Sequence, residues 1–130
     1  MGRSAARDSL FKLIYEYTIR GEEDGFTLSL FMNGLNDDDA EYLTSSYKGI
    51  ISESEALKKK IAEYSQGFAV DRIYKIDLAI LMVAFYEILF RNDIPDAVSA
   101  NEATELAKKY STDKSYSFVN GIIASVIKEK

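Results

Sequence analysis

The apolar residues of this chain recur mostly every three or four positions, a pattern that predicts amphipathic helices. The opening segment shows the pattern most clearly, with apolar side chains at Ala6, Leu10, Leu13, Ile14 and Tyr17. The pair Arg20-Gly21 follows this segment and is expected to end its helix. Alternation with a period of two, which would indicate strands, is weak throughout the chain.

Capping signals predict where several further helices begin. Asn36 is a good N-cap candidate, because the aspartates that follow it favour the positive end of a helix dipole. The segments Ser52–Glu55 and Ser99–Glu102 each match a capping box, in which serine is followed three residues later by glutamate. Thr112 or Asp113 is expected to cap the last helix.

The segment from Asp77 to Arg91 is apolar on nearly every side. A helix of that composition is surrounded by other helices, so we expect it to be the central element of the second half. Its most apolar part, residues 78–86, is too short to span a bilayer. A short helix over residues 26–33 and a single turn over residues 71–76 are expected elsewhere.

These elements together predict an all-α protein with about six to seven helices. Gly67 marks a boundary between an N-terminal helical subdomain, residues 1–66, and a C-terminal helical subdomain, residues 67–130. The chain length suits a single domain in which these two small helical bundles pack together and share a core.

The sequence contains no cysteine and no histidine. This excludes disulfides, Cys/His zinc sites and any Ser–His or Cys–His catalytic arrangement. The run Asp37–Asp39 is not expected to bind a metal ion, because consecutive residues of a helix point in different directions. We therefore expect a protein that is not an enzyme and has no cofactor. The N-terminus lacks the apolar run of a signal peptide, which favours a cytoplasmic protein without a membrane segment.

The net charge of −5 is unevenly distributed along the chain. Residues 1–66 carry a net charge of −4 and residues 67–130 a net charge of −1. By contrast, the first 20 residues carry a net positive charge of +2. A protein that binds nucleic acid needs local lysine and arginine whatever its total charge, so the opening helix is the first place to look.

Several short motifs follow one another between residues 76 and 121. They are Ile76-Asp77, Ala79-Ile80-Leu81, Ala84, Tyr86-Glu87, Ile94-Pro95, Val98, Asn101-Glu102-Ala103, Glu105-Leu106-Ala107-Lys108-Lys109, Ser115 and Phe118-Val119-Asn120-Gly121. In these motifs, their order and their spacing the chain resembles the NusB family of transcription antitermination factors. The first half resembles the family only through Ala6-Arg7-Asp8 and Leu13-Ile14-Tyr15.

The resemblance implies two helical bundles packed together and a function in transcription antitermination. NusB-like proteins bind a short single-stranded RNA element, boxA, together with the ribosomal protein NusE. The complex joins transcribing RNA polymerase and supports antitermination, notably in ribosomal RNA operons. Family members occur as monomers and as homodimers. An alternative is a NusB-like protein-interaction adaptor with little RNA affinity, which the acidic pI of about 4.8 favours.

The resemblance also implies which residues bind RNA, on the opening helix and around the start of the last one. They are Arg3, Arg7, Lys12, Tyr15, Lys114, Phe118 and Asn120. The cationic side chains are expected to contact phosphates, and the rings to stack on unpaired bases. Arg3 and Arg7 lie four residues apart and therefore on one helical face, but an ordinary solvated helix start has the same pattern.

The other members of this set also have structural alternatives. Tyr15 and Phe118 are equally compatible with packing between helices, and Asn120 with a structural hydrogen bond. Lys114 stands where the family commonly has an acidic residue, so here it adds attraction for RNA. All of these residues are expected to meet in one composite cationic and aromatic face.

The resemblance places Glu87 and Arg91 at the surface that binds NusE. A glutamate in such an apolar helix is expected at the helix edge or in an ion pair. The alternative to a partner contact is an internal ion pair between Glu87 and Arg91, which lie four residues apart.

Overall fold

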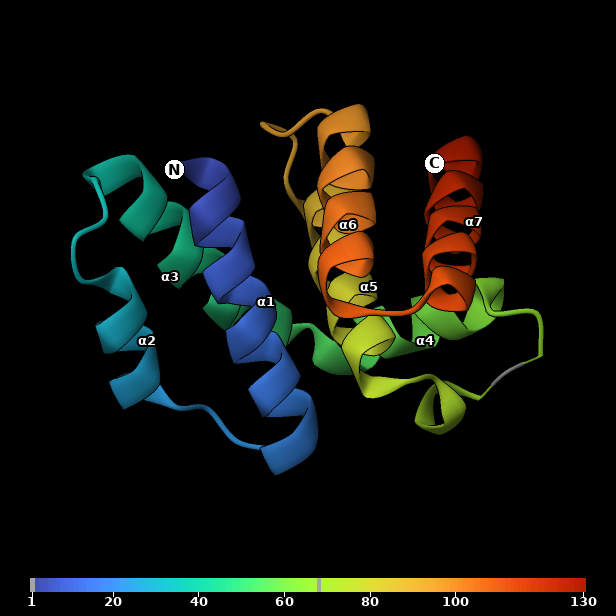
Figure 1. The fold of residues 1–130 in the computed structure, drawn as a ribbon, viewed down its shortest axis with the longest axis horizontal. Helices are drawn as coiled ribbons and strands as arrows, with labels where there is room; N and C mark the ends of the chain where they lie inside the picture. Colours follow the sequence, from blue (N-terminus) through green and yellow to red (C-terminus); the bar gives the residue numbers. More distant parts are fainter. Residues whose placement is uncertain (1, 68) are drawn as a thin grey trace.

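The computed structural model describes residues 2–67 and 69–130, and in these residues the chain is helical without strands (Figure 1). The described part contains seven α-helices and one short 3-10 helix. Their bounds are α1 Arg3–Arg20, α2 Gly25–Met32, α3 Asp37–Ser52, α4 Ser54–Tyr64, η1 Val70–Arg72, α5 Lys75–Phe90, α6 Asp96–Tyr110 and α7 Asp113–Glu129. The predicted fold class is therefore confirmed.

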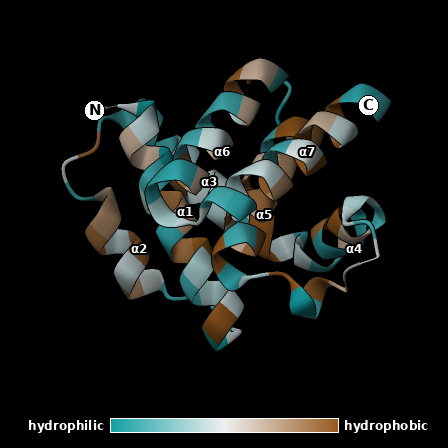
Figure 2. Cartoon of the chain, turned by 45° about the vertical axis from the view of Figure 1, so that its right-hand side comes forward, coloured by the Kyte–Doolittle hydropathy of each residue, from teal (hydrophilic) through white to brown (hydrophobic). Residues whose placement is uncertain are grey.

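Helix α5 is the central element of the fold and packs against α1, α3, α4, α6 and α7. Every residue from Asp77 to Phe85 is buried, because the helix is apolar on all sides. Figure 2 shows this helix as a largely hydrophobic ribbon enclosed by helices with mixed surfaces. The prediction of a central helix over residues 77–91 is confirmed, and its burial contributes about 25 cal/mol per Å² of apolar surface.

Several helix ends follow the capping signals of the sequence. The Asn36 side chain accepts a hydrogen bond from the backbone N–H of Asp39 at 2.8 Å. The Thr112 side chain likewise accepts from the backbone N–H of Ser115 at 3.1 Å and caps α7. Gly21 ends α1 in the left-handed conformation that glycine adopts without strain.

The two predicted capping boxes do not form. Helix α4 begins at Ser54, close to the expected position, but no side chain caps it. Helix α6 begins directly after Pro95, so Ser99 lies inside the helix and not at its N-cap. Ser99 and Glu102 instead point to buried partners on other helices, and these tertiary contacts replace the local hydrogen bonds of a capping box.

The two halves of the chain meet along α1 and α5, which have the most extensive contact of any helix pair. The division into subdomains at residues 66 and 67 stays a prediction. Among the described residues, no helix is both long enough and apolar enough to cross a membrane.

Candidate functional site

A buried polar network joins four helices around the carboxylate of Glu87 in α5. Arg7 of α1 donates to Glu87 Oε2 from its Nε at 2.8 Å, and Ser99 of α6 donates to Oε1 at 2.7 Å. The hydroxyl of Tyr42 in α3 also donates to Oε2. Arg7 makes a second ion pair with Glu102 at 3.1 Å. No buried side-chain nitrogen or oxygen in the described residues lacks a hydrogen-bond partner, so the network is fully satisfied.

The electrostatics of this network keep Arg7 charged. Burial opposes the charge of Arg7, but the hydrogen bond to Glu87 and the neighbouring carboxylates outweigh it and raise its pKa. Burial and the negative charge of Glu87 raise the pKa of Tyr42, which remains a neutral hydrogen-bond donor. The network is therefore a fixed ion pair with a neutral phenol beside it.

This geometry corrects the expected roles of Arg7 and Glu87. Arg7 is 3% exposed and both its ion pairs are internal, so its guanidinium cannot reach an RNA phosphate. Glu87 is completely buried and cannot lie on a surface for a protein partner in this structure. Its ion-pair partner is Arg7, not the Arg91 that helical spacing suggested. Sequence spacing identifies local pairs, whereas Arg7 and Glu87 are neighbours only in the folded chain.

Three arginines surround the ring of Tyr42. The guanidinium carbons of Arg3, Arg7 and Arg91 lie 4.5, 5.4 and 5.6 Å from the ring centroid. Such positions stabilise a cation by about 0.5–1 kcal/mol at exposed sites and more where water is excluded. The structure thus gathers two expected RNA contacts and one expected partner contact around a tyrosine that the sequence did not single out.

Arg3 and Arg91 each have a further acidic partner. Arg3 pairs with the buried Asp39 at 3.1 Å, so the last aspartate of the run at the start of α3 has a cationic partner within the chain. Arg91 pairs with Asp93 at 2.9 Å, and this contact lowers the pKa of Asp93 to about 2. Arg91 also donates to Ser45 and retains partial exposure. Neither guanidinium is free of internal partners.

The middle of α1 is joined to the C-terminal end of α6 through Asp8. Lys12 pairs with Asp8 at 3.1 Å, Lys109 pairs with it at 3.3 Å, and Tyr110 donates to it at 2.7 Å. Burial alone raises the pKa of Asp8, but the hydrogen bonds from Tyr110 and Lys12 outweigh this effect and the pKa is lowered. This places Lys12, with about half of its side chain exposed, beside the α6 end.

Aromatic side chains follow the same boundary between α1 and α6. The ring of Phe11 stacks on Tyr110 at a centroid distance of 4.9 Å and on Tyr15 at 6.3 Å. Tyr15 is therefore half-buried and supported from one side. Its partial exposure remains compatible with stacking on a base, which is a prediction.

Lys114 and Phe118 line a pocket at the start of α7. The pocket has a volume of about 190 Å³ and is completed by η1 and the first turn of α5, with Arg72 and Tyr74 in its wall. Neither Arg72 nor Lys114 makes an ion pair within the described chain, and the Tyr74 side chain is 55% exposed. Asp77 is the one acidic residue of the lining, and it accepts a hydrogen bond from Ser111.

This cation–aromatic pocket, defined by Arg72, Tyr74, Lys114 and Phe118, combines two cations with two aromatic rings, residue types suited to phosphates and unpaired bases. Sequence reasoning missed Arg72 and Tyr74. The available signal was a cation and an exposed aromatic residue just before the central helix, but only the fold brings them to α7.

The expected composite face therefore forms only in part. Lys12 and Tyr15 lie near the C-terminal end of α6, which leads into α7, whereas Arg3 lies at the opposite end of α1 against α3. In Figure 1 the N-terminal end of α1 lies at the upper left, whereas the loop between α6 and α7 lies lower and nearer the middle of the molecule. Asn120 is exposed and accepts a hydrogen bond from Thr104 at 3.3 Å, apart from the pocket lining.

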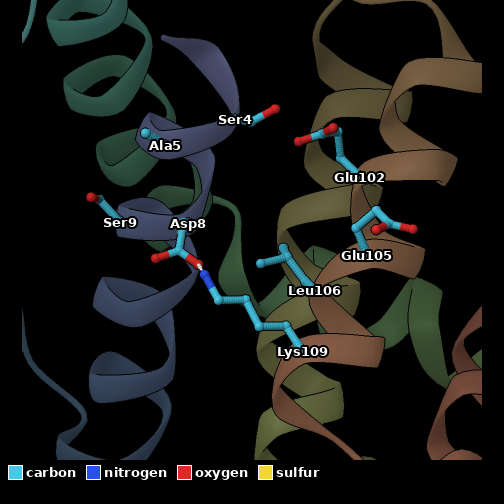
Figure 3. A pocket seen from close by; sticks show the side chains of 8 residues that line it. All are labelled: Ser4, Ala5, Asp8, Ser9, Glu102, Glu105, Leu106 and Lys109. Carbon is cyan, nitrogen blue, oxygen red and sulfur yellow. Dashed lines mark hydrogen bonds and ion pairs between the residues drawn. The ribbon is translucent and has the colours of Figure 1, made fainter. Parts of the chain in front are cut away.

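A second, larger concavity lies between α1 and α6 and has a different character. Figure 3 shows Asp8 of α1 paired with Lys109 of α6, with Glu102 and Glu105 further along α6. Its volume is about 570 Å³, and its lining includes three carboxylates, Asp8, Glu102 and Glu105. Lys109 is its one cation, and it is already paired with Asp8. This acidic groove repels phosphate and suits a cationic side chain from a protein.

Comparison with known proteins agrees with this all-helical architecture. The family model described as the NusB family matches residues 4–128. The chain belongs to the NusB family. It is 43% identical to the transcription antitermination protein NusB of Acetivibrio thermocellus, over 100% of this chain and 91% of the relative. It is 40% identical to the protein of the same name from Finegoldia magna, over 100% and 96% of the two chains.

Solved NusB structures have the same fold. The structure of T. maritima NusB matches with a TM-score of 0.88 at 29% identity, covering 99% of this chain and 92% of that one. A complex of the antitermination factors NusB and NusE with double-stranded RNA contains a chain with a TM-score of 0.88 at 24% identity. That match covers 98% of this chain and 97% of the other, and it supports the fold alone.

Proposed function

We propose that this NusB-family protein is a transcription antitermination factor. It binds boxA-type single-stranded RNA together with the ribosomal protein NusE, as part of an antitermination complex on RNA polymerase, notably in ribosomal RNA operons. Relatives with about 40% identity over nearly their whole length are transcription antitermination proteins. A solved NusB with the same fold occurs in a complex with NusE and double-stranded RNA.

The cation–aromatic pocket is the observation that carries the RNA-binding part of this proposal. Lys114 and Arg72 make no ion pair in the described chain, and they line the pocket together with two rings, Tyr74 and Phe118. A surface with this combination of residues is suited to single-stranded nucleic acid, because its cations contact the phosphates and its rings stack on unpaired bases. Lys12 and Tyr15 extend the surface along α1.

The acidic groove between α1 and α6 is where we expect a basic residue of NusE to bind. Glu102 joins this groove to the buried network, because it pairs with Arg7 and also lines the open side. Glu87 then acts on the partner surface only indirectly, by holding the Arg7 that positions Glu102. Arg91, with its guanidinium partly exposed, stays a candidate contact at the far end of α5.

A protein-interaction adaptor with little RNA affinity is the second candidate. Burial of Arg7 and the ion pair of Arg3 leave the opening helix with few free cations. The affinity of the isolated chain for RNA is then expected to be weak and strongly dependent on salt, with a slope of about −0.7 per neutralised phosphate on single strands. Binding of NusE would raise the affinity by making part of the RNA contact intramolecular.

Titration of boxA RNA with the protein, with and without NusE, tests the proposal. The titrations are run at about 50 mM and about 200 mM salt. We expect RNA binding to be weaker at the higher salt concentration and stronger when NusE is present. NusE binding without RNA binding in either titration favours the adaptor. If the protein binds neither NusE nor RNA, both candidate functions are refuted.

We also propose that the protein acts in the cytoplasm and is not an enzyme. Its relatives are named transcription antitermination proteins, and the absence of cysteine and histidine leaves few groups for general acid–base or nucleophilic chemistry. Monomers and homodimers are both compatible with the acidic groove as described.

A further inference from the structure

Helix α2 is apolar on two opposite sides, although only one side packs on the core. Leu28 is buried, and the Met32 sulfur accepts a hydrogen bond from Thr44 of α3. On the other side Phe26 is 73% exposed and Leu30 is 59% exposed. These two residues lie one turn apart, so they form a continuous apolar ridge on the surface. The helix itself contains no charged residue.

The segments that precede and follow α2 in the sequence are acidic. Residues 21–47 include seven aspartates and glutamates but no lysine or arginine. Glu23 precedes α2, and Asp37 and Asp38 follow it; all three are exposed and make no ion pair in the described chain. Arg20, at the end of α1, is the nearest cation in sequence, and Glu16, Glu22 and Asp24 already surround it.

A shallow groove of about 390 Å³ runs beside the ridge, lined by Ser29, Leu30, Met32 and Asn33. An exposed apolar helix next to such a groove is a feature of surfaces that bind another helix. The surrounding carboxylates then select the charge of the partner, because like charges brought together cost several kcal/mol and opposite charges raise the association rate.

We propose that the exposed face of α2, defined by Phe26 and Leu30, binds a cationic amphipathic helix of a protein partner. Apolar side chains of that helix cover Phe26 and Leu30, and its lysines or arginines face Glu23, Asp37 and Asp38. RNA does not fit this face, because phosphates would meet unpaired carboxylates. A second copy of the chain does not fit either, because the same carboxylates would face each other across a two-fold axis. This surface is thus separate from the RNA and NusE surfaces proposed above.

The probe for this proposal is a synthetic amphipathic helix of about 18 residues, long enough to be helical in part on its own. One version carries leucines on one face and lysines on the other, and a second carries glutamates in place of the lysines. Fluorescence anisotropy measures the binding of each to the protein. The lysine peptide is expected to bind and the glutamate peptide is not.

Two variants with matched controls identify the surface. The double variant Phe26→Ser/Leu30→Ser is expected to weaken binding of the lysine peptide about tenfold or more, as for residues at an interface centre. The control Val98→Ser removes an apolar side chain that is 43% exposed on α6 and should leave binding unchanged. Because all three side chains are exposed, the variants should remain folded, and circular dichroism checks this.

The charge requirement is tested by Glu23→Gln/Asp37→Asn/Asp38→Asn, which should weaken binding and reduce its salt dependence. The control Glu55→Gln/Glu63→Gln/Glu129→Gln changes the net charge equally at exposed sites outside the surfaces proposed above. Equal effects of the two triple variants, or peptide binding that survives Phe26→Ser/Leu30→Ser, would overturn the proposal. So would a dimer, seen by sedimentation, that the same double variant dissociates. Failure of this test leaves the boxA titration unaffected.

Discussion

Arg7 and Glu87 form a buried ion pair in which Arg7 Nε donates to Glu87 Oε2 at 2.8 Å. The pair fastens α1 to the central helix α5, and Tyr42 and Ser99 extend it to α3 and α6. Removal of one partner from such a pair leaves a buried charge without compensation, which destabilises proteins more than the pair itself stabilises them.

The variant Arg7→Met is therefore expected to lower the free energy of unfolding by about 3–5 kcal/mol, because the buried Glu87 loses its cationic partner. Urea denaturation measures this effect. The double variant Arg7→Met/Glu87→Gln should recover part of the loss. Arg20→Met is the control: its ion pairs with Glu16 and Glu22 lie on the surface, so we expect a loss of less than about 1 kcal/mol. Equal losses for Arg7→Met and Arg20→Met would contradict the buried-pair account.

Two glycines inside helices should respond to alanine in opposite directions. A Cβ at Gly49 of α3 would overlap the ring of Tyr86 on α5, so Gly49→Ala is expected to cost about 1–3 kcal/mol. A Cβ at Gly121 of α7 meets no atom within 4 Å. Gly121→Ala should stabilise the protein by about 0.5–1 kcal/mol, because alanine favours the helix. Thermal unfolding of both variants checks the signs, and a stabilised Gly49→Ala would show that α3 and α5 pack less closely.

The salt bridge between Arg91 and Asp93 should contribute to stability in a defined pH range. Its hydrogen bonds lower the pKa of Asp93 to about 2, below the ordinary value of about 3.9. The stabilisation is therefore present above about pH 4 and is lost as the pH falls toward about 2. Because Asp93 is largely exposed, we expect less than about 1 kcal/mol.

Comparison of the wild type with Asp93→Asn isolates this contribution from the other carboxylates. The difference in their urea midpoints should be present at neutral pH and vanish near the acid end of the range. A constant difference across the whole range would mean that Asp93 titrates normally.

Much of the fold was predictable because its determinants are local. The apolar spacing of residues 77–91 predicted the buried α5, and Asn36 and Thr112 predicted two helix starts through the hydrogen bonds that form there. The prediction of a capping box at Ser99–Glu102 was wrong, because the Ser99 side chain bonds to Glu87 and the Glu102 side chain bonds to Arg7. Local hydrogen-bond signals are reliable only when no tertiary partner competes for them.

The candidate site was less predictable because its neighbours are distant in sequence. Arg7 and Glu87 are separated by 80 positions, and no periodicity indicates that they pair. Family motifs drew attention to Lys114 and Phe118, and the structure adds Arg72 and Tyr74 to their pocket. The residue types needed for RNA binding can be identified from the sequence. Only the fold shows which of the cations remain without an internal ion pair.

Charge reversal at Lys114 should weaken RNA binding and flatten its salt dependence. If Lys114 neutralises one phosphate, Lys114→Glu is expected to reduce the salt slope by about 0.7. Lys48→Glu is the matched control, since Lys48 is also exposed without an ion pair but lies on α3. Binding isotherms with boxA RNA at several salt concentrations measure both slopes. Unchanged affinity of Lys114→Glu at low salt would place Lys114 outside the RNA path.

Tyr74 offers a direct test of the cation–aromatic pocket, because its side chain is 55% exposed and caps no helix end. Its removal should therefore change stability little. A base that stacks on the ring contributes about 1–3 kcal/mol, so Tyr74→Ala is expected to weaken boxA binding by about five- to 150-fold. Phe90→Ala serves as the control: Phe90 is also an exposed ring on α5, but it lies at the opposite end of that helix. Equal RNA affinity for Tyr74→Ala and Phe90→Ala, with both variants folded, would remove Tyr74 from the binding surface and leave the pocket without one of its two stacking rings.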